Sequence, residues 1–559
     1  MAFAILFYFA TRQAYWDYFS GDDLDKTGWP TLISWGDFAR QLVTPRFSPD
    51  LFRPVGYLYY RIMGRTFQLT YWPYVVVLQV GHVINVVLLF FVLRRLKFSD
   101  FAAAAGALFF SFHAAVIDIY WQPQYIFEVL ACMLSFLAML LYMRGSWLLA
   151  IIPFWFAYKS KEITVTLPLV LLAYELLLGE RKWKRLIPYF VISLNFGLQA
   201  VWHNRHTSLA SGYVLRFTPE ILWHTVAFYA SAIFFLPLAG LALLVLPFLL
   251  RDRVAWLGSI FMVALFVPMI VLPGRLESVY WYIPLVGVTL LFAVLFSRLP
   301  PFVTVLFLLI WLPLNYKMSY PHRAELFAIG SDTRWYTTGL VAYARTVPHL
   351  KAVVYEGTPW RLGSWGVEGA IHHAFGFDVD AVWYMNPKAG EVIHRVPMAI
   401  VAYDPFRHAV TGRLRTADLP ETYIRFRDRN WVTESQLGDG WYDRDTPLRW
   451  IAPRAEARFY RPPAPVEFQI EATVPEDNLR KNGPSKVTLL EDGRPLGTAE
   501  LSIDSRHPLR WKLPAGEPGV KLITILCEPV RHGGPQDPRD LGIAISALGY
   551  VTASDPSEK

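Results

Sequence analysis

Apolar stretches that end in clusters of basic residues constrain the fold of this chain more than any other feature. The basic clusters lie at 94–97, 181–185, 251–253 and at Arg298. An α-helix needs about 20 apolar residues to cross the hydrocarbon core of a bilayer, and several of these stretches approach that length. Because positive charge in short loops favours the cytoplasmic side, the clusters mark cytoplasmic loops. The sequence therefore predicts an integral protein of the cytoplasmic membrane whose N-terminus is cytoplasmic.

The hydrophobic segments predict about 11 spans in a polytopic α-helical membrane domain. They lie at about 2–19, 72–93, 101–119, 125–143, 147–158, 163–178, 186–202, 232–250, 254–272, 281–297 and 300–316. Two of them, 147–158 and 163–178, are short. We expect half-buried helices there, around a cavity, because broken backbone is tolerated beside a cavity. An odd number of spans places residue 318 onward outside the cytoplasm.

Composition separates the chain into three predicted parts. Residues 1–317 form the membrane domain, including amphipathic loop helices at 29–43 and 52–68. Residues 318–427 mix a helical run with short strand runs and predict a small α/β unit. Residues 428–559 alternate strands and turns, as at Asp492-Gly493, which predicts an extracytoplasmic β-sandwich that could bind carbohydrate.

Composition also excludes several classes of protein. A hydrophobic content of 54% is too high for a water-soluble chain of this size. The net charge of +8 suits anionic lipid headgroups and phosphate-bearing substrates. Basic residues are spread over loops on both faces, so nucleic acid is not an expected partner. The two cysteines, Cys132 and Cys527, form no CxxC metal or redox motif.

The unusual polar residues gather on one predicted face of the membrane. Threading the chain between the basic loops places a common set outside the cytoplasm: Asp22, Asp23, His113, Asp118, Lys159, Lys161, Glu162, Arg275, Glu277 and Tyr282. Charges with purely structural roles have no reason to choose one face. The distribution therefore predicts a catalytic surface.

Three carboxylates are candidates for acid–base chemistry. Asp22 and Asp23 follow the first span, where one of them could take a proton from an acceptor hydroxyl. The alternative is a solvated N-cap for a loop helix. Asp118 offers a second carboxylate opposite the pair. His113, five residues before it, has the pattern of a buried core histidine more than that of a catalyst.

The candidate cations suit a phosphate group. Arg53, before Pro54, could clamp a phosphate with two hydrogen bonds or extend to lipid headgroups. The charges of Lys159, Lys161 and Glu162 interrupt an apolar stretch, which predicts a water-filled pocket where Lys161 meets a phosphate. The alternative is a tight hairpin that reaches bulk water.

A second candidate group opens the tenth predicted span. Arg275 could neutralise a leaving phosphate, and Glu277 lies two residues further on. Tyr280 and Tyr282 could stack on a sugar or line an isoprenoid groove. An aromatic belt at the membrane interface is the alternative, and it accounts for Trp281.

Taken in order, these motifs resemble those of the GT-C glycosyltransferases, and most closely the O-mannosyltransferase-like group that in eukaryotes carries tetratricopeptide repeats. The matching segments are Asp22-Asp23, Phe52-Arg53-Pro54-Val55, His113 with Asp118, Ser160-Lys161-Glu162 with Leu167-Pro168 and Tyr174-Glu175-Leu176, and Glu277 with Tyr282-Ile283-Pro284. Ala114 stands where the family usually has proline, and the repeats are absent.

The resemblance implies an inverting glycosyltransferase that uses a polyprenyl-phosphate sugar donor and an acceptor hydroxyl on a protein, lipid or glycan. Asp22 or Asp23 would be the base, and the donor phosphate would lie among Lys161, Arg275 and Arg53. No metal is required by this scheme because the cations supply the charge, and a divalent ion stays an open alternative. The other classes to weigh are a transporter or flippase of a lipid-linked glycan and a non-catalytic scaffold with a glycan-binding β-sandwich.

Overall fold

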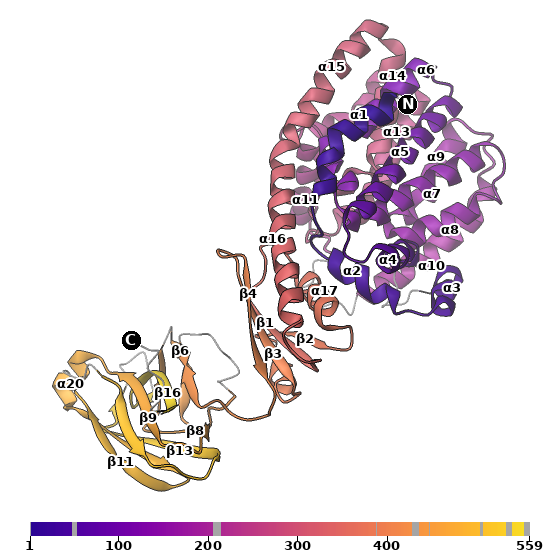
Figure 1. Ribbon diagram of the computed structural model, residues 1–559. Helices are drawn as coiled ribbons and strands as arrows, with labels where there is room; N and C mark the ends of the chain where they lie inside the picture. Colours follow the sequence, from indigo (N-terminus) through magenta and orange to yellow (C-terminus); the bar gives the residue numbers. More distant parts are fainter. Residues whose placement is uncertain are drawn as a thin grey trace. The chain divides into compact units, whose positions relative to one another are not determined.

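The computed structural model describes residues 2–46, 53–204, 214–386, 388–426, 435–445, 448–502, 507–532 and 539–552 (Figure 1). Phe52 of the arginine–proline motif lies outside these residues. The chain forms two compact units. The first comprises Met1–Ala344, Gly357–Phe377 and Tyr403–Val410, and the second comprises Arg345–Glu356, Asp378–Ala402 and Thr411–Lys559. This division differs from the predicted boundary at residue 317.

The first unit is helical. Its α-helices are α1 (Ala2–Thr11), α2 (Asp23–Gly28), α3 (Trp35–Val43), α4 (Pro54–Phe67), α5 (Trp72–Arg95), α6 (Asp100–Ser111), α7 (Ile126–Met143), α8 (Ile151–Ser160), α9 (Leu167–Leu177), α10 (Ile187–Asn204), α11 (Pro219–Ala232), α12 (Leu246–Leu250), α13 (Arg253–Ile270), α14 (Leu285–Arg298), α15 (Pro301–Met318), α16 (Tyr320–Ala344) and α17 (Ser364–Phe375). Short 3₁₀ helices connect several of them, among them η3 (Ala114–Tyr120), η5 (Glu162–Thr166) and η8 (Ser278–Trp281).

Four helical segments of the described chain are long and apolar enough to cross a membrane. They are Trp72–Arg95, Pro123–Met143, Arg253–Ile270 and Pro301–Ala344, and α6 with η3, bent by 76°, could form one more. Other predicted spans are interrupted. The α-helix of the first ends at Thr11, and the span at 232–250 breaks where Leu238 takes a left-handed backbone with φ 57°. The count of eleven stays a prediction.

Close packing of small residues joins the central helices. A Cβ on Gly258 of α13 would lie 2.7 Å from the carbonyl oxygen of Gly287 on α14, and the reverse distance is 2.3 Å. Only glycine at both positions permits this approach. Small residues at helix crossings are the usual solution where lipid removes the hydrophobic drive between helices.

Several of the predicted cytoplasmic loops contact one another in pairs. Arg298, after α14, donates to the carbonyl of Leu250 at 2.6 Å and to Asp252 at 3.0 Å. Arg95, at the end of α5, donates to the carbonyl of Met143 at 2.7 Å. Since α7 has 18 residues and ends at Met143, that end lies about 27 Å from the start of the same helix.

The second unit begins with a small mixed sheet. Strands β1 (Ala352–Glu356), β2 (Asp380–Trp383), β3 (Met398–Asp404) and β4 (Ala409–Arg415) form one sheet in the order β2-β1-β3-β4, and β1 pairs in parallel with β2 and β3. Parallel pairing needs crossover connections, which agrees with the predicted α/β character.

The C-terminal part is a β-sandwich. Its strands are β5 (Tyr423–Arg425), β6 (Trp441–Asp445), β7 (Leu448–Ile451), β8 (Arg454–Arg461), β9 (Val466–Thr473), β10 (Ser485–Glu491), β11 (Arg494–Leu501), β12 (Leu509–Leu513), β13 (Gly519–Glu528) and β16 (Ala544–Thr552). One sheet has the order β11-β10-β13-β8 and the other β12-β9-β16-β7-β6, with β5 beside β16. Buried side chains of both sheets, such as Ile525 and Phe468, share one core.

Candidate functional site

Three segments that are distant in sequence meet around the ring of Phe127, at the start of α7. Lys26 of α2 places its Nζ 5.5 Å from the centre of this ring, and Arg53 places its Cζ at the same distance. The α4 backbone comes so close that a Cβ on Gly56 would lie 2.1 Å from the ring. We call Phe127 and the charged residues that surround it, described in the next paragraphs, the Phe127 cluster.

The two adjacent aspartates have different environments. Asp22 is 38% exposed, and its Oδ2 lies 3.5 Å from the Nζ of Lys26 one helical turn later. Asp23 is completely buried, and the hydroxyl of Tyr60 donates to its Oδ1 at 2.6 Å. Burial raises the pKa of Asp23 to about 7, although the Tyr60 hydrogen bond and the charge of Lys26 oppose this. Of the two carboxylates, Asp22 is the one open to a substrate.

The raised pKa of Asp23 makes stability depend on pH. A carboxyl whose pKa is higher in the folded state makes the protein less stable as pH rises. The loss accumulates between the pKa in the unfolded chain, 3.8, and the pKa in the folded state, about 7. Asp23→Asn removes this loss and keeps an acceptor for Tyr60. We expect its stability advantage over the wild type to grow by about 2–3 kcal/mol between pH 5 and pH 8, measured by thermal unfolding. The exposed Asp37→Asn is the control, and an advantage for Asp23→Asn that is constant with pH would contradict the buried charge.

Two ion pairs, one partly buried and one almost fully buried, form the centre of the Phe127 cluster. Arg53, the N-cap residue of α4, donates from Nε to Oε2 of Glu162 at 2.8 Å and from Nη2 to Oε1 at 2.6 Å. Lys161 lies 2.5 Å from Oε1 of Glu128, with both side chains almost fully buried. Burial alone would raise the pKa of Glu162, but the charges of Arg53 and Lys161 hold it at about 2.

The break between α8 and η5 explains how neighbouring charges reach different partners. Lys161 has an extended backbone, with φ −151° and ψ 130°, between the two helices. Consecutive side chains of an extended segment point to opposite sides. Lys161 therefore reaches Glu128 on α7, whereas Glu162 reaches Arg53.

Residues around η8 extend the cluster. The Nζ of Lys161 lies 5.3 Å from the ring centre of Tyr280. Arg275 Nη1 lies 3.5 Å from Oε1 of Glu277, and both side chains are about one-third exposed. Tyr125 donates to Oε2 of Glu277 at 3.4 Å. Arg275 is thus the more accessible cation and Lys161 the more buried one.

Asp118 lies at the border of this arrangement. It is 6% exposed, and the Nε2 of His322 lies 2.7 Å from its Oδ1. It also interacts electrostatically with Tyr125, as do Glu128 and Glu277. Its carboxylate is held by a histidine of α16, which favours a positioning role over direct contact with a substrate.

Three predicted site residues contact groups that do not belong to the Phe127 cluster. Tyr282 is buried, with its hydroxyl 2.9 Å from both His82 and Asn85 in the helical core. His113 caps η3, accepting from the amide of Ala115, and packs against aromatic rings. Lys159 lies beside the rings of Trp155 and Tyr158, with its Nζ 3.5 Å from the carbonyl of Arg46. In the residues that the structure describes, these contacts are with groups outside the Phe127 cluster.

Helix α17 fixes the backbone that carries the aspartate pair. A Cβ on Gly366 would lie 2.1 Å from the carbonyl oxygen of Gly21, and one on Gly369 would lie 2.3 Å from the amide nitrogen of Asp25. His373 Nε2 lies 2.8 Å from the hydroxyl of Thr27. A segment of the chain beyond residue 356 thus supports α2.

A methyl group at Gly369 should disturb this support. Because the obstructing atoms are backbone, Gly369→Ala must displace α2, and we expect a loss of about 1–3 kcal/mol of stability. Gly363→Ala is the matched control, since its Cβ would meet nothing within 4 Å. Thermal unfolding of both variants tests this. Equal melting temperatures would contradict the close packing of α17 on α2.

Sequence reasoning missed several members of the cluster. Glu128 is an acidic residue inside an apolar segment, and an ionisable residue in such a position is itself a signal of function. Lys26 lies four residues after Asp22, at the spacing of a helical ion pair. The partners Tyr60 and His322 carry no comparable signal in the sequence. In the described ranges, no group of three His, Cys, Asp or Glu side chains is arranged to hold a metal ion.

Comparisons with known proteins do not assign this chain to a family. No family model matches the chain. No curated protein matches it either. Among solved structures, the chain is similar to the crystal structure of ArnT from Cupriavidus metallidurans in the apo state, with 13% identity and a TM-score of 0.46 over 72% of this chain and 93% of that one. A likeness of this degree supports no inference about activity, so the functional case rests on the contacts above.

Proposed function

We propose that the chain is an inverting glycosyltransferase of the GT-C type, which moves a sugar from a polyprenyl-phosphate donor to an acceptor hydroxyl at the outer face of the cytoplasmic membrane. One observation carries the proposal. Charged groups from α2, α4, α7 and the segment between α8 and η5 converge at Phe127, although their positions in the sequence range from 22 to 162.

The roles follow from exposure and charge. Asp22, the accessible carboxylate, takes the proton of the acceptor hydroxyl as the acceptor oxygen bonds to the anomeric carbon of the donor. The bond from that carbon to the phosphate oxygen breaks on the opposite face, and its electron pair leaves on the phosphate. Arg275, the accessible cation, stabilises that charge, and Lys161 adds to the field from within. Asp23 and Tyr60 hold the Asp22 backbone in place.

The pairing of the cations with acids suits such a site. Arg53 and Lys161 are already bound to Glu162 and Glu128 before a donor enters. Groups that are fixed in advance need little reorganisation when charge develops on the leaving phosphate, and a water-poor site strengthens their effect. The resemblance to O-mannosyltransferases suggests mannose as the sugar, and a lipid, protein or glycan as the acceptor.

A deletion strain tests the proposal for every class of acceptor at once. Mass spectrometry of envelope lipids, proteins and glycans should show a sugar missing from one class, restored by the wild-type chain and not by Asp22→Asn. Restoration by Asp22→Asn would contradict catalysis by this cluster and would favour a transporter or a scaffold. Unchanged glycans in the deletion strain would contradict the transferase itself.

A further inference from the structure

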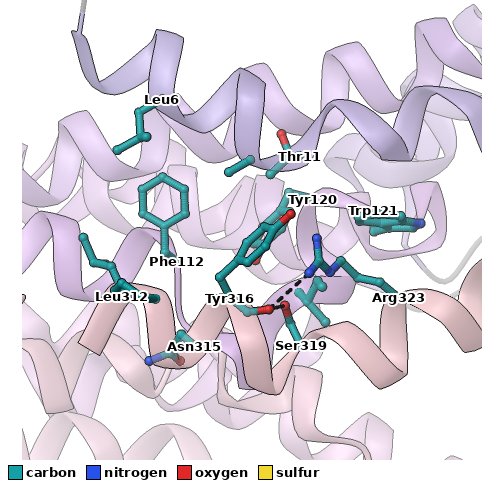
Figure 2. Close-up of a pocket in the computed structure, with 13 residues that line it drawn as sticks. Leu6, Thr11, Phe112, Tyr120, Trp121, Leu312, Asn315, Tyr316, Ser319 and Arg323 are labelled. Carbon is teal, nitrogen blue, oxygen red and sulfur yellow. Dashed lines mark hydrogen bonds between the residues drawn. The ribbon is translucent and has the colours of Figure 1, made fainter. Parts of the chain in front are cut away.

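A cavity of about 340 Å³ separates α1 from α15, and none of the residues that line it belongs to the Phe127 cluster. Figure 2 shows Leu6 and Thr11 on one wall and Leu312, Asn315, Tyr316 and Ser319 on the other. Phe112, Tyr120 and Trp121 line the space between them. Its size lies within the range of small-molecule sites.

The polarity of the cavity changes along its length. Leu6, Phe112 and Leu312 make the end opposite Arg323 apolar (Figure 2). Ser319 and Arg323 follow on the same side of α15 and α16, so the arginine lies about 16 Å along the helix axis from Leu312. Leu6 and Tyr316, which line the cavity, are about half exposed. The space therefore opens on a surface that carries apolar side chains.

Arg323 is a buried cation with incomplete hydrogen bonding. It is 4% exposed, and its guanidinium lies 4.0 Å from the ring centre of Tyr316. One nitrogen donates to the carbonyl of Tyr316 at 3.1 Å, whereas Nε has no hydrogen-bond partner in the described part of the chain. The nearby acids Asp118 and Glu325 face His322 instead. No carboxylate of the described residues forms an ion pair with Arg323.

We propose that this cavity binds one anionic membrane lipid, with an acyl chain between α1 and α15 and the phosphate at Arg323. A buried cation without a counter-charge is costly, so the occupant must be anionic. Apolar walls that open to the bilayer select a lipid over a free anion. Hydroxyl groups beside the lipid headgroup come from Thr11, Ser319 and Tyr120. The site is separate from the proposed donor site and does not depend on it.

Lipid retention by the purified full-length chain tests this site. After incubation with equal amounts of phosphatidylglycerol and phosphatidylcholine, native mass spectrometry should show one retained phosphatidylglycerol. Arg323→Gln should lower this preference about tenfold, since it removes a charge-assisted contact. Ala10→Phe should fill the space for the acyl chain and lower retention of the lipid as well. The exposed cation Arg12 supplies the matched control, because Arg12→Gln leaves the cavity unchanged.

A second variant keeps the test valid if Arg323→Gln does not fold. Ser319→Asp places a carboxylate one turn before Arg323, so it should remove the preference while keeping the arginine. An Arg323→Gln or Ser319→Asp protein that retains phosphatidylglycerol as the wild type does would overturn the proposal. Displacement of the lipid by millimolar inorganic phosphate would overturn it too, because it would show a site for a free anion.

Discussion

Asp22→Asn should reduce sugar transfer by about 10²–10⁴-fold, the usual contribution of a general base. Asparagine keeps the size of the side chain and its place beside Lys26 but cannot accept the acceptor's proton. Because Asp22 is 38% exposed at the start of α2, the change should leave the melting temperature nearly unaltered. Transfer in reconstituted membranes, with thermal unfolding beside it, separates the catalytic effect from a folding defect.

Two comparisons make this result specific. Asp37→Asn alters an exposed carboxylate of the same loop, 56% exposed and paired with Arg40, and should keep transfer within about twofold of the wild type, as surface changes usually do. Asp23→Asn should lose less activity than Asp22→Asn, since Asp23 is buried behind it. A larger loss in Asp23→Asn would assign the base to Asp23, and full activity in both would contradict the mechanism.

Lys161→Met should be the most destabilising single change in the cluster. It leaves Glu128 as a buried charge without its partner, which costs about 3–5 kcal/mol. The double variant Lys161→Met/Glu128→Gln removes both charges and should recover most of that stability. Transfer should nevertheless stay low in the double variant, because a cation near the leaving phosphate is lost. Thermal unfolding and transfer assays on the wild type, Lys161→Met, Glu128→Gln and the double variant form a double-mutant cycle.

The cycle distinguishes structure from chemistry. If the Lys161–Glu128 pair only holds α8 against α7, the double variant should recover transfer together with stability. Glu128→Gln alone also lowers stability, because it leaves Lys161 buried without its partner. It keeps the cation, so below its melting temperature it should retain most of the transfer activity. Recovery of both properties in the double variant would contradict a role for Lys161 in charge stabilisation.

Long regular segments can be predicted from the sequence because one local pattern decides them. The predicted span 72–93 corresponds to α5 at Trp72–Arg95, and the predicted turn at Asp492-Gly493 lies between β10, which ends at Glu491, and β11, which begins at Arg494. The segment 232–250 is not one continuous helix, because Leu238 takes a left-handed backbone that interrupts it. Hydropathy does not reveal such a break, so the sequence predicts a single span there. Local composition also predicts a boundary at residue 317, whereas α16 and α17 continue the helical unit.

The candidate site likewise contains some residues that a local pattern predicts and others that only tertiary packing determines. Charges that interrupt an apolar stretch, such as Lys161 and Glu162, can be recognised because a charge is costly to place in the membrane. The direction that a side chain takes depends on tertiary packing, so Tyr282, between η8 and α14, lies in the core with His82. The support of α2 by α17 joins residues more than 300 positions apart, as Thr27 and His373 show, and no local pattern encodes it.

The most direct test of the central claim is a structure of the full chain in a lipid nanodisc with a bound polyprenyl phosphate. We expect a phosphate oxygen within about 4 Å of the guanidinium of Arg275, the usual limit of an ion pair, with the isoprenoid extending from there into the bilayer. Asp22 should face the same space. A phosphate that contacts none of Arg275, Lys161 and Arg53 would contradict the proposal that the Phe127 cluster is the transferase site.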